Sequence, residues 1–490
     1  MTLYFRSCIA LFFLSLAASG LAQESANSDS SVRYPANYFA EFTPLTVNDM
    51  LDRVPGIDLI LNNGGANADG DRGLGASANI LIDGKRLAGK AHEARAQLDR
   101  ISADQVDYIQ IVRGTSAELD VQNTGQLVNI VLLEAQSRSS LSSELSARHF
   151  EDGTIEPGLS LAWNGQSGNL TYLLSGQIEP AYAHSYSLEQ AVNGDFSPKE
   201  VIAFDRYTEQ TDYSLNSNLA WTLGNGDRLA LNALYNENDP PSHLLRSLTS
   251  FDAGTSSTRY ERESVPATAS DWELGTDYEH GFANGNRFRA LLIVNEEKSA
   301  STRERFRSDS IGGSETKDLF LDTTNRYRER IARSSYTMNL NEGQGLELGA
   351  EIAQTIQDNS LKLGVLTANP GSPEFGGLTP VNFGNANSTV EEFRVEPFAI
   401  HNWQINPRMS LESSLVGEYS EIEQSGDLSV KRDFSFIKPK FDWRFDLSNS
   451  LQIRATLEKF VSQLSFADFS RSSNEEDDEE NTKAGNPTLE

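Results

Sequence analysis

The chain has 490 residues, which is too long for one ordinary compact domain of about 150 residues. Only 38% of the residues are hydrophobic, and beyond the N-terminal segment no run reaches the roughly 18 apolar residues of a spanning helix, which excludes a polytopic helical membrane protein. The net charge of -29 argues against nucleic acid as a partner, and the one cysteine, Cys8, excludes both an intrachain disulfide and a cysteine-based zinc site.

Residues 1–22 have the pattern of a secretory signal peptide. Arg6 supplies the positive charge, Ile9 to Leu16 are almost all apolar, and Gly20 and Ala22 fit the small-residue positions before a cleavage site at Gln23. The apolar run is too short to span a membrane as an anchor. We therefore expect export from the cytoplasm.

Residues 46–138 mix helical and strand patterns. Thr46 and Asp49 form a capping-box pattern that opens a short helix, which Pro55-Gly56 ends. Asp83-Gly84 is a tight-turn signal between two short strands at 80–82 and 85–87. Further strands are expected at 108–112 and 126–133. This region is predicted to be a small α+β domain.

From residue 139 onward the hydrophobic pattern has a period of two, as in β-strands. In residues 213–223 one face is mostly apolar and the other is polar, with Tyr213, Leu215, Leu219 and Trp221 on the first face and Asn216 and Asn218 on the second. A soluble β-sandwich would bury the apolar face, whereas a membrane barrel turns it towards lipid.

The connection lengths favour the membrane barrel. About thirteen strands are predicted, joined by short turns such as 224–227 and 281–286 that alternate with long polar loops, roughly 183–207, 236–270, 295–330, 357–390 and 420–433. Short periplasmic turns alternating with long extracellular loops are typical of outer-membrane barrels. The predicted fold class is an all-β antiparallel transmembrane barrel behind a small N-terminal α+β domain.

Several segments of the first region resemble the plug domain of TonB-dependent outer-membrane receptors. Their order and spacing match the family. They are Asn48–Ile57 with Pro55 and Gly56, Asp71–Gly73, Ile80–Arg86 with Asp83 and Gly84, Ile101–Ile109, Val112–Gly114, and Val128–Val131 with Asn129. Gly485–Glu490 is similar to a motif that such receptors carry late in the barrel.

The resemblance implies a 22-stranded barrel with the plug in its lumen. Thirteen strands would then leave the barrel C-terminally incomplete, and we expect residues 46–138 to be the plug and 139–490 the barrel. Residues 23–45 would be an extended periplasmic segment with a possible TonB box, in which Val32 and Tyr34 are candidate contacts for a TonB-type energy transducer. Arg72 and Arg113 are the candidates for locking the plug to the barrel.

No catalytic or cofactor-binding constellation is recognised, so no enzyme activity and no cofactor are expected. The six histidines lack metal-ligand spacing, and Gly84–Lys90 has phosphate-loop spacing but Ala91 where Ser or Thr is required. The acidic run at 475–480 lacks the glycine and alternation of a calcium loop. We therefore predict no metal site.

The sequence thus predicts a receptor of the Gram-negative outer membrane that imports a scarce nutrient, either an iron chelate, cobalamin or an oligosaccharide. The alternatives are a binding or signalling receptor without transport, or a nonfunctional remnant. Outer-membrane lipid and lipopolysaccharide are expected as surroundings. The acidic balance of the whole chain slightly favours a neutral or cationic ligand.

Overall fold

The fold is described from a computed structural model of the chain. The structure describes residues 31–44, 46–55, 57, 80–82, 84–86, 98, 101, 103–113, 126–133, 139–252, 255–341, 343–382, 384–406, 408–448, 451–461, 466, 472–473 and 482–483. The predicted signal peptide lies outside these residues. No helix within them is long and apolar enough to cross a membrane.

The N-terminal domain contains a five-stranded sheet with the order β1-β4-β5-β2-β3. Its strands are β1 (Ser31–Pro35), β2 (Ile80–Ile82), β3 (Lys85–Arg86), β4 (Val106–Arg113) and β5 (Gln126–Leu132), and its helices are α1 (Val47–Leu51) and the 3-10 turns Ala36–Phe42 and Ala103–Gln105. β2 and β5 run parallel, and the other pairs are antiparallel. This confirms the predicted mixed α+β domain.

The local signals of this domain act as the sequence predicts. Thr46 and Asp49 form a reciprocal capping box at the start of α1, since each side chain accepts a hydrogen bond from the backbone N–H of the other, at 3.2 and 3.0 Å. Gly84 has a φ of 73°, which favours glycine in the turn between β2 and β3. Its N–H donates to Oδ1 of Asn129 at 2.8 Å, so Asn129 ties the turn to β5.

The core of this domain is apolar and almost fully buried. It joins the first 3-10 turn, α1 and the sheet through side chains that include Phe39, Met50, Leu51, Ile109 and Ile130. Burying a side chain of this size contributes about 1.5–3 kcal/mol. Leu173 of the second region belongs to the same cluster, so the two regions share apolar contacts.

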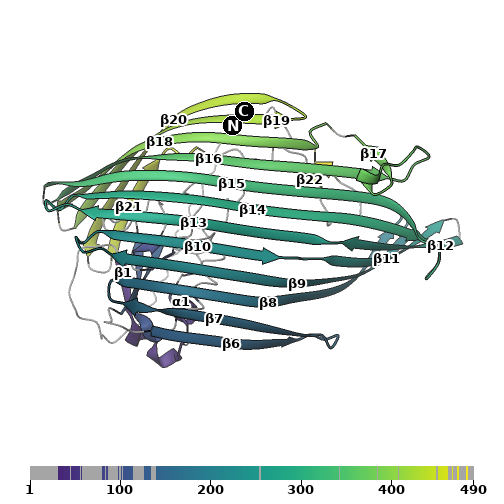
Figure 1. Ribbon diagram of the computed structural model, residues 1–490, viewed down its shortest axis with the longest axis horizontal. Coiled ribbons are helices and arrows are strands. Elements are labelled where there is room, and N and C mark those ends of the chain that lie inside the picture. Colours follow the sequence, from purple (N-terminus) through teal and green to yellow (C-terminus); the bar gives the residue numbers. More distant parts are fainter. Residues whose placement is uncertain are drawn as a thin grey trace, which may run out of the picture.

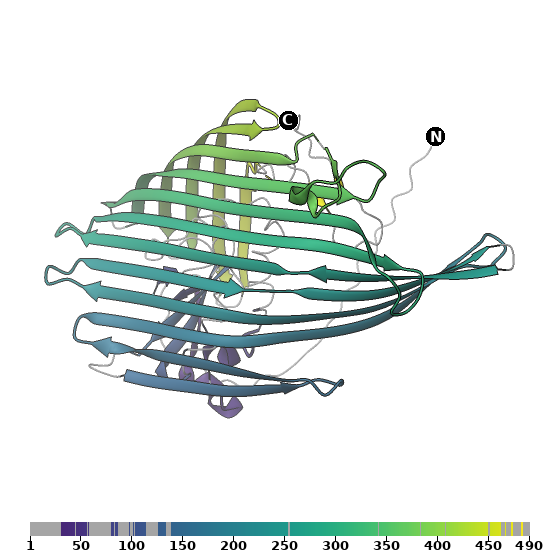
Figure 2. The ribbon, with the colours of Figure 1, turned by 45° about the vertical axis from the view of Figure 1, so that its right-hand side comes forward.

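The second region is a 16-stranded antiparallel sheet that curves round at its β18–β21 end (Figures 1 and 2). Its strands are β6 (Ser139–His149), β7 (Ile155–Ser167), β8 (Leu170–Val192), β9 (Pro198–Thr222), β10 (Arg228–Asn238), β11 (Ser242–Asp252), β12 (Thr255–Val265), β13 (Ala267–Gly281), β14 (Arg287–Ser308), β15 (Thr316–Asn341), β16 (Gln344–Val365), β17 (Thr379–Val381), β18 (Asn387–Asn406), β19 (Met409–Gly426), β20 (Val430–Ser448) and β21 (Leu451–Glu458). We call this sheet the wall. The described residues also include a 3-10 turn, Pro373–Phe375, and the two short strands β22 (Ser472–Ser473) and β23 (Thr482–Lys483).

The wall has thirteen strand positions, as predicted. β10 and β11 both pair with β9, and β12 and β13 both pair with β14, so each of these two couples is one long strand with a break. The breaks lie at Pro240-Pro241 and at Pro266, because proline has no N–H to donate to the ladder. β17 is a three-residue addition to β16.

The prediction of long polar loops between the hairpins is wrong. Most of their residues lie in paired strands: β8 and β9 stay paired as far as Val192 opposite Pro198, and β14 and β15 as far as Arg307 opposite Thr316, each ladder with one register shift near its end. The short connections at the other end of the wall are as predicted. The apolar face that marks a strand is missing where both faces are polar, which is why these extensions resemble loops in the sequence.

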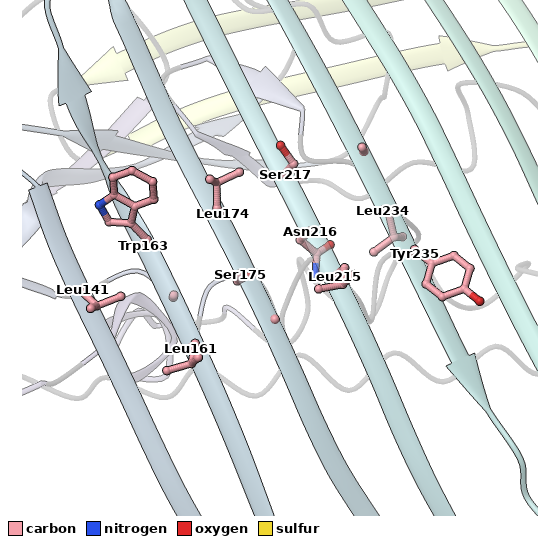
Figure 3. A pocket seen from close by; sticks show the side chains of 13 residues that line it. Leu141, Leu161, Trp163, Leu174, Ser175, Leu215, Asn216, Ser217, Leu234 and Tyr235 are labelled. Carbon is pink, nitrogen blue, oxygen red and sulfur yellow. The ribbon is translucent and has the colours of Figure 1, made fainter.

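The two faces of the wall differ in polarity. The side chain of Asn164 contacts the N-terminal domain. Asn164, its register partner Leu173 on β8, and Asn218, the partner of Leu173 on β9, define the inner face. Figure 3 shows the outer face, where Leu141, Leu161, Trp163, Leu215 and Tyr235 surround a shallow apolar hollow of about 410 Å³. The apolar residues therefore point away from the N-terminal domain, which we call the plug as the resemblance predicts, and this is the arrangement of a barrel that faces lipid.

Candidate ligand-binding surface

The plug and the wall meet at β7 and β8. The Nε2 group of Gln105 donates a hydrogen bond of 2.6 Å to Oδ1 of Asn164, and Leu173 packs into the plug core. Gln105 lies at the end of the 3-10 turn that leads into β4. A shift of β4 would therefore be transmitted to β7 and β8 through these contacts.

A cluster of arginines and carboxylates lies on the inner face of the wall, on the strand extensions furthest from the short turns. We call it the distal ionic cluster; it consists of Arg246 on β11, Arg259, Glu261 and Glu263 on β12, Arg303, Arg305 and Arg307 on β14, and Asp318 on β15. Arg246 on β11 is the register partner of Phe204 on β9. Since side chains alternate along a strand, Phe204 lies on the same face as Asn216 and Asn218, and so does Arg246.

The centre of the distal ionic cluster is buried, and its charges are paired. Glu263 accepts from Arg246 at 2.9 Å and from Arg303 at 2.7 and 2.8 Å, and the side chains of Arg246 and Glu263 are 2% and 4% exposed. Asp318 holds Arg305 at 3.0 Å and Arg307 at 2.7 Å. Charges at this depth need partners, because an isolated one is very costly to desolvate.

The rim of the distal ionic cluster is accessible and positive. Arg259 and Arg307 flank Glu261 at 3.0 and 2.9 Å, and their side chains are 45% and 36% exposed. The cluster has five arginines and three carboxylates, so two positive charges remain in excess. The local charge is therefore opposite to that of the whole chain, and it favours an anionic ligand rather than the neutral or cationic one expected from composition.

A second buried ionic group lies on the inner face further round the wall. Arg394 on β18 contacts Glu351 and Glu396 at 3.3 Å each, and Lys438 on β20 contacts Glu396 at 2.6 Å and Glu418 at 2.7 Å. These pairs link four neighbouring strands. The group has two cations and three carboxylates, so it carries no excess positive charge and is better suited to bracing the wall than to holding an anionic ligand.

The distal ionic cluster was not among the predicted sites. Its residues lie in the segments 236–270 and 295–330, which the hydrophobic pattern predicts to be loops. Arg303, Arg305 and Arg307 nevertheless recur at every second position. A polar pattern with a period of two indicates one face of a strand just as an apolar one does. This is the signal in the sequence that would have identified the cluster.

The structure locates part of the predicted plug signature. Gly84 and Asn129 are brought together by a hydrogen bond, and Pro55 follows α1 in the chain. Gly56, Asp83, Gly114 and the locking candidate Arg72 lie outside the described residues, and of the other locking candidate, Arg113, the structure describes the backbone at the end of β4. The locking role of both arginines stays a prediction.

The two candidate transducer contacts lie on β1, which pairs antiparallel with β4. Val32 is exposed, and Tyr34 packs against the plug core and lies 5.1 Å from Tyr38 between ring centroids. Among the described residues no group of three or more His, Cys, Asp or Glu is placed to hold a metal ion.

Residues 23–125 match the family model described as the TonB-dependent receptor plug domain. Over 405 residues the chain is 22% identical to the ferric enterobactin receptor of Pseudomonas aeruginosa, a match that covers 77% of this chain and 52% of that protein. The chain thus spans about half the length of this curated relative.

Two solved structures are also similar. One is the ferric enterobactin receptor of Pseudomonas aeruginosa in complex with enterobactin, with 12% identity, coverage of 87% of this chain and 93% of that one, and a TM-score of 0.25. The other is a Serratia marcescens hemophore receptor in complex with its hemophore and heme, with 12% identity, coverage of 95% and 68%, and a TM-score of 0.45.

Proposed function

We propose that this chain, which carries the plug domain of the TonB-dependent receptors in front of an antiparallel barrel wall, is an outer-membrane receptor for an anionic ferric chelate. The observation that carries the choice of ligand is the positive rim of the distal ionic cluster, where Arg259 and Arg307 are exposed. The relative named as a ferric enterobactin receptor supports an iron chelate over cobalamin or an oligosaccharide.

The geometry supports a coupling between the ligand and the plug. A chelate bound at the distal ionic cluster would lie on the inner face of the wall, the same face that holds the plug through Asn164 and Leu173. Import requires that ligand binding shifts a segment of the plug on the periplasmic side, where an energy transducer would engage it. The short β1 strand, with Val32 exposed, is the segment we assign to that contact.

Equilibrium binding of a ferric tris-catecholate, followed by quenching of tryptophan fluorescence, tests the choice of ligand. We expect Arg259→Gln combined with Arg307→Gln to weaken binding about tenfold or more, equivalent to about 1.4 kcal/mol. Lys431→Gln is the matched control, because Lys431 pairs with Glu421 on the outer face. Unchanged binding in the double variant, or equal binding of a neutral chelate, would contradict the proposal.

Uptake of radioactive iron by cells tests import itself. Transport should depend on the membrane potential, and it should be lost when the energy transducer is deleted while chelate binding at the surface remains. Binding that is never followed by uptake would favour a receptor without transport.

A further inference from the structure

The outer face of the wall carries a cluster of cations next to its apolar band. We call it the outward basic cluster; it consists of Lys298 on β14 and Arg326, Arg328 and Arg330 on β15. The three arginines recur at every second residue, so their side chains share one face. That face is the outer one, since Glu329 and Ile331, the neighbours of Arg330 on the other face, are buried, and Leu292, the register partner of Ala332, is exposed.

The position of the outward basic cluster along the strands matches a membrane boundary. On β14 the outer face is apolar at Phe288, Ala290, Leu292 and Val294, and the charged residues Glu296 and Lys298 follow. A tilted strand crosses the hydrocarbon core in about 9–11 residues. Trp272 lies opposite Glu296, at the level where aromatic side chains mark the edge of the bilayer. Lys298, Arg326 and Arg328 therefore lie at the level of the outer-leaflet headgroups, and Arg330, the register partner of Val294, lies at the end of the apolar band.

The arrangement of charges in the outward basic cluster favours an anion. Lys298 is the register partner of Arg326, and like charges directly opposite each other on neighbouring strands are destabilising. Within the three strands β14–β16, four cations face two carboxylates: Glu296, which accepts from Arg326 at 2.8 Å, and Asp358, which accepts from Arg328. Glu391, one strand further on, accepts instead from Gln354 at 2.6 Å.

Two donors of the outward basic cluster are enclosed and have no hydrogen-bond partner in the described part of the chain. They are Nε of Arg326 and Nε of Arg328. A guanidinium that turns towards an arriving phosphate can use these donors, and arginine matches phosphate with paired, charge-assisted hydrogen bonds. An anion would thus relieve both the like-charge contact and the unused donors.

We propose that the outward basic cluster binds a phosphate group on the headgroup of a glycolipid in the outer leaflet. Lys298, Arg326 and Arg328 hold the phosphate, while acyl chains lie along the apolar band formed by Leu292, Val294 and Ile352. The inference rests on the proposed function, since it requires the wall to sit in an outer membrane. It adds a lipid site on the face opposite to the ligand surface.

Native mass spectrometry of the full chain in detergent tests this site with three probes: diphosphorylated lipid A, the same lipid without its phosphates, and inorganic phosphate. We expect lipid A to bind at least tenfold more tightly than the dephosphorylated lipid. Lys298→Gln combined with Arg326→Gln should remove this preference, and Lys431→Gln should retain it. Glu296→Gln should bind lipid A at least as tightly as the parent chain, because it frees Arg326 and leaves all four cations in place.

Three results would overturn the proposal. They are a double variant that binds lipid A like the parent chain, equal binding of the dephosphorylated lipid, or displacement of lipid A by inorganic phosphate at an equal concentration. Circular dichroism of each variant checks that the strand content is retained. Ferric chelate binding in the same variants separates the two proposals: the lipid site predicts no change there, and a chain that binds lipid A but no chelate contradicts the proposed function alone.

Discussion

Gln105 of the plug and Asn164 of the wall are joined by a hydrogen bond of 2.6 Å, although 59 residues separate them in the sequence. Asn164 is buried, and its strand neighbour on β8, Leu173, packs into the plug core. A polar contact and an apolar contact thus hold the plug at one place on the wall. The polar one can be removed without opening a large cavity.

We expect Gln105→Ala and Asn164→Ala each to weaken retention of the plug, and the double variant to add little to either. A net contribution of about 0.5–1.5 kcal/mol is typical of such a hydrogen bond, with a further cost where one buried partner is left unsatisfied. The measurement is a double-mutant cycle on the urea concentration at which the plug becomes sensitive to protease. Strict additivity of the two single effects would show that the residues are not coupled.

Glu263 is the buried carboxylate on which two arginines depend. Glu263→Gln removes the carboxylate that binds Arg303 and leaves Arg246 with Glu261 at 3.4 Å, and breaking a buried ion pair in this way costs about 3–5 kcal/mol. The free energy of unfolding, measured in urea with the chain in lipid vesicles, should fall by an amount of this order.

Glu315→Gln is the matched control for Glu263→Gln. Glu315 binds Arg262 at 2.6 Å, but both side chains are about two-fifths exposed, and exposed pairs contribute about 0–1 kcal/mol. If the two variants lost equal stability, the burial of the distal ionic cluster would not be what sets its energetic importance.

The sequence predicted the plug and the wall for physical reasons that the structure makes visible. The capping box of Thr46 and Asp49, the Asp83-Gly84 turn and the apolar alternation of Leu215 and Leu219 are all local signals, so each can be recognised without knowing the rest of the fold. The thirteen wall positions followed from the same alternation.

The extensions of the strands and the distal ionic cluster could not be predicted in the same way. They have polar residues on both faces, and their pairing depends on long-range ion pairs such as that between Arg303 and Glu263, 40 residues apart. Overall charge predicts a neutral or cationic ligand, whereas the distal ionic cluster favours an anionic one, because a chain with a net charge of -29 still concentrates arginines on one face. Strand register decides which charged side chains lie together, and the composition of the chain carries no information about register.

The assignment of inner and outer faces can be tested on β9. Leu219 lies on the apolar outer face and Asn218 on the inner face. We expect Leu219→Arg to reduce the yield of membrane-inserted protein more than Asn218→Arg, because an arginine facing lipid near the midplane costs about 2–4 kcal/mol. The yield of heat-modifiable protein on a gel measures insertion. Equal yields, or the reverse order, would mean that the register is assigned to the wrong face.

The turn at Asp227 should respond to acid. The hydroxyl of Tyr278 donates to Asp227, and with help from Asn225 and His280 it holds the pKa of Asp227 below its ordinary value, although burial acts in the opposite direction. A carboxyl with a lowered pKa stabilises the folded state above its unfolded pKa, and that stabilisation is lost as the pH falls towards the lowered value.

Tyr278→Phe should therefore destabilise the turn at neutral pH, and the difference from the parent chain should shrink below the ordinary pKa of an aspartate. Protease sensitivity of the 223–227 turn across this pH range is the measurement. The exposed turn at Asp195, whose pKa is lowered by Ser197, is a control that Tyr278→Phe should leave unchanged. A difference that grows in acid would give the opposite sign and contradict the assignment.

The contact with an energy transducer can be tested on β1 with two neighbouring cysteine variants. Val32 is exposed, whereas Tyr34 packs against the plug core and against Tyr38. We expect Val32→Cys to form a disulfide with a cysteine placed in the periplasmic domain of the transducer, at a rate that rises when the ferric chelate is bound. Val32 and Tyr34 share one face of β1, but Tyr34→Cys should react more slowly, because Tyr34 is packed against the plug core whereas Val32 is exposed. Faster reaction at Tyr34 than at Val32, or no effect of the chelate on either, would rule out β1 as the segment that reports ligand binding to the periplasm.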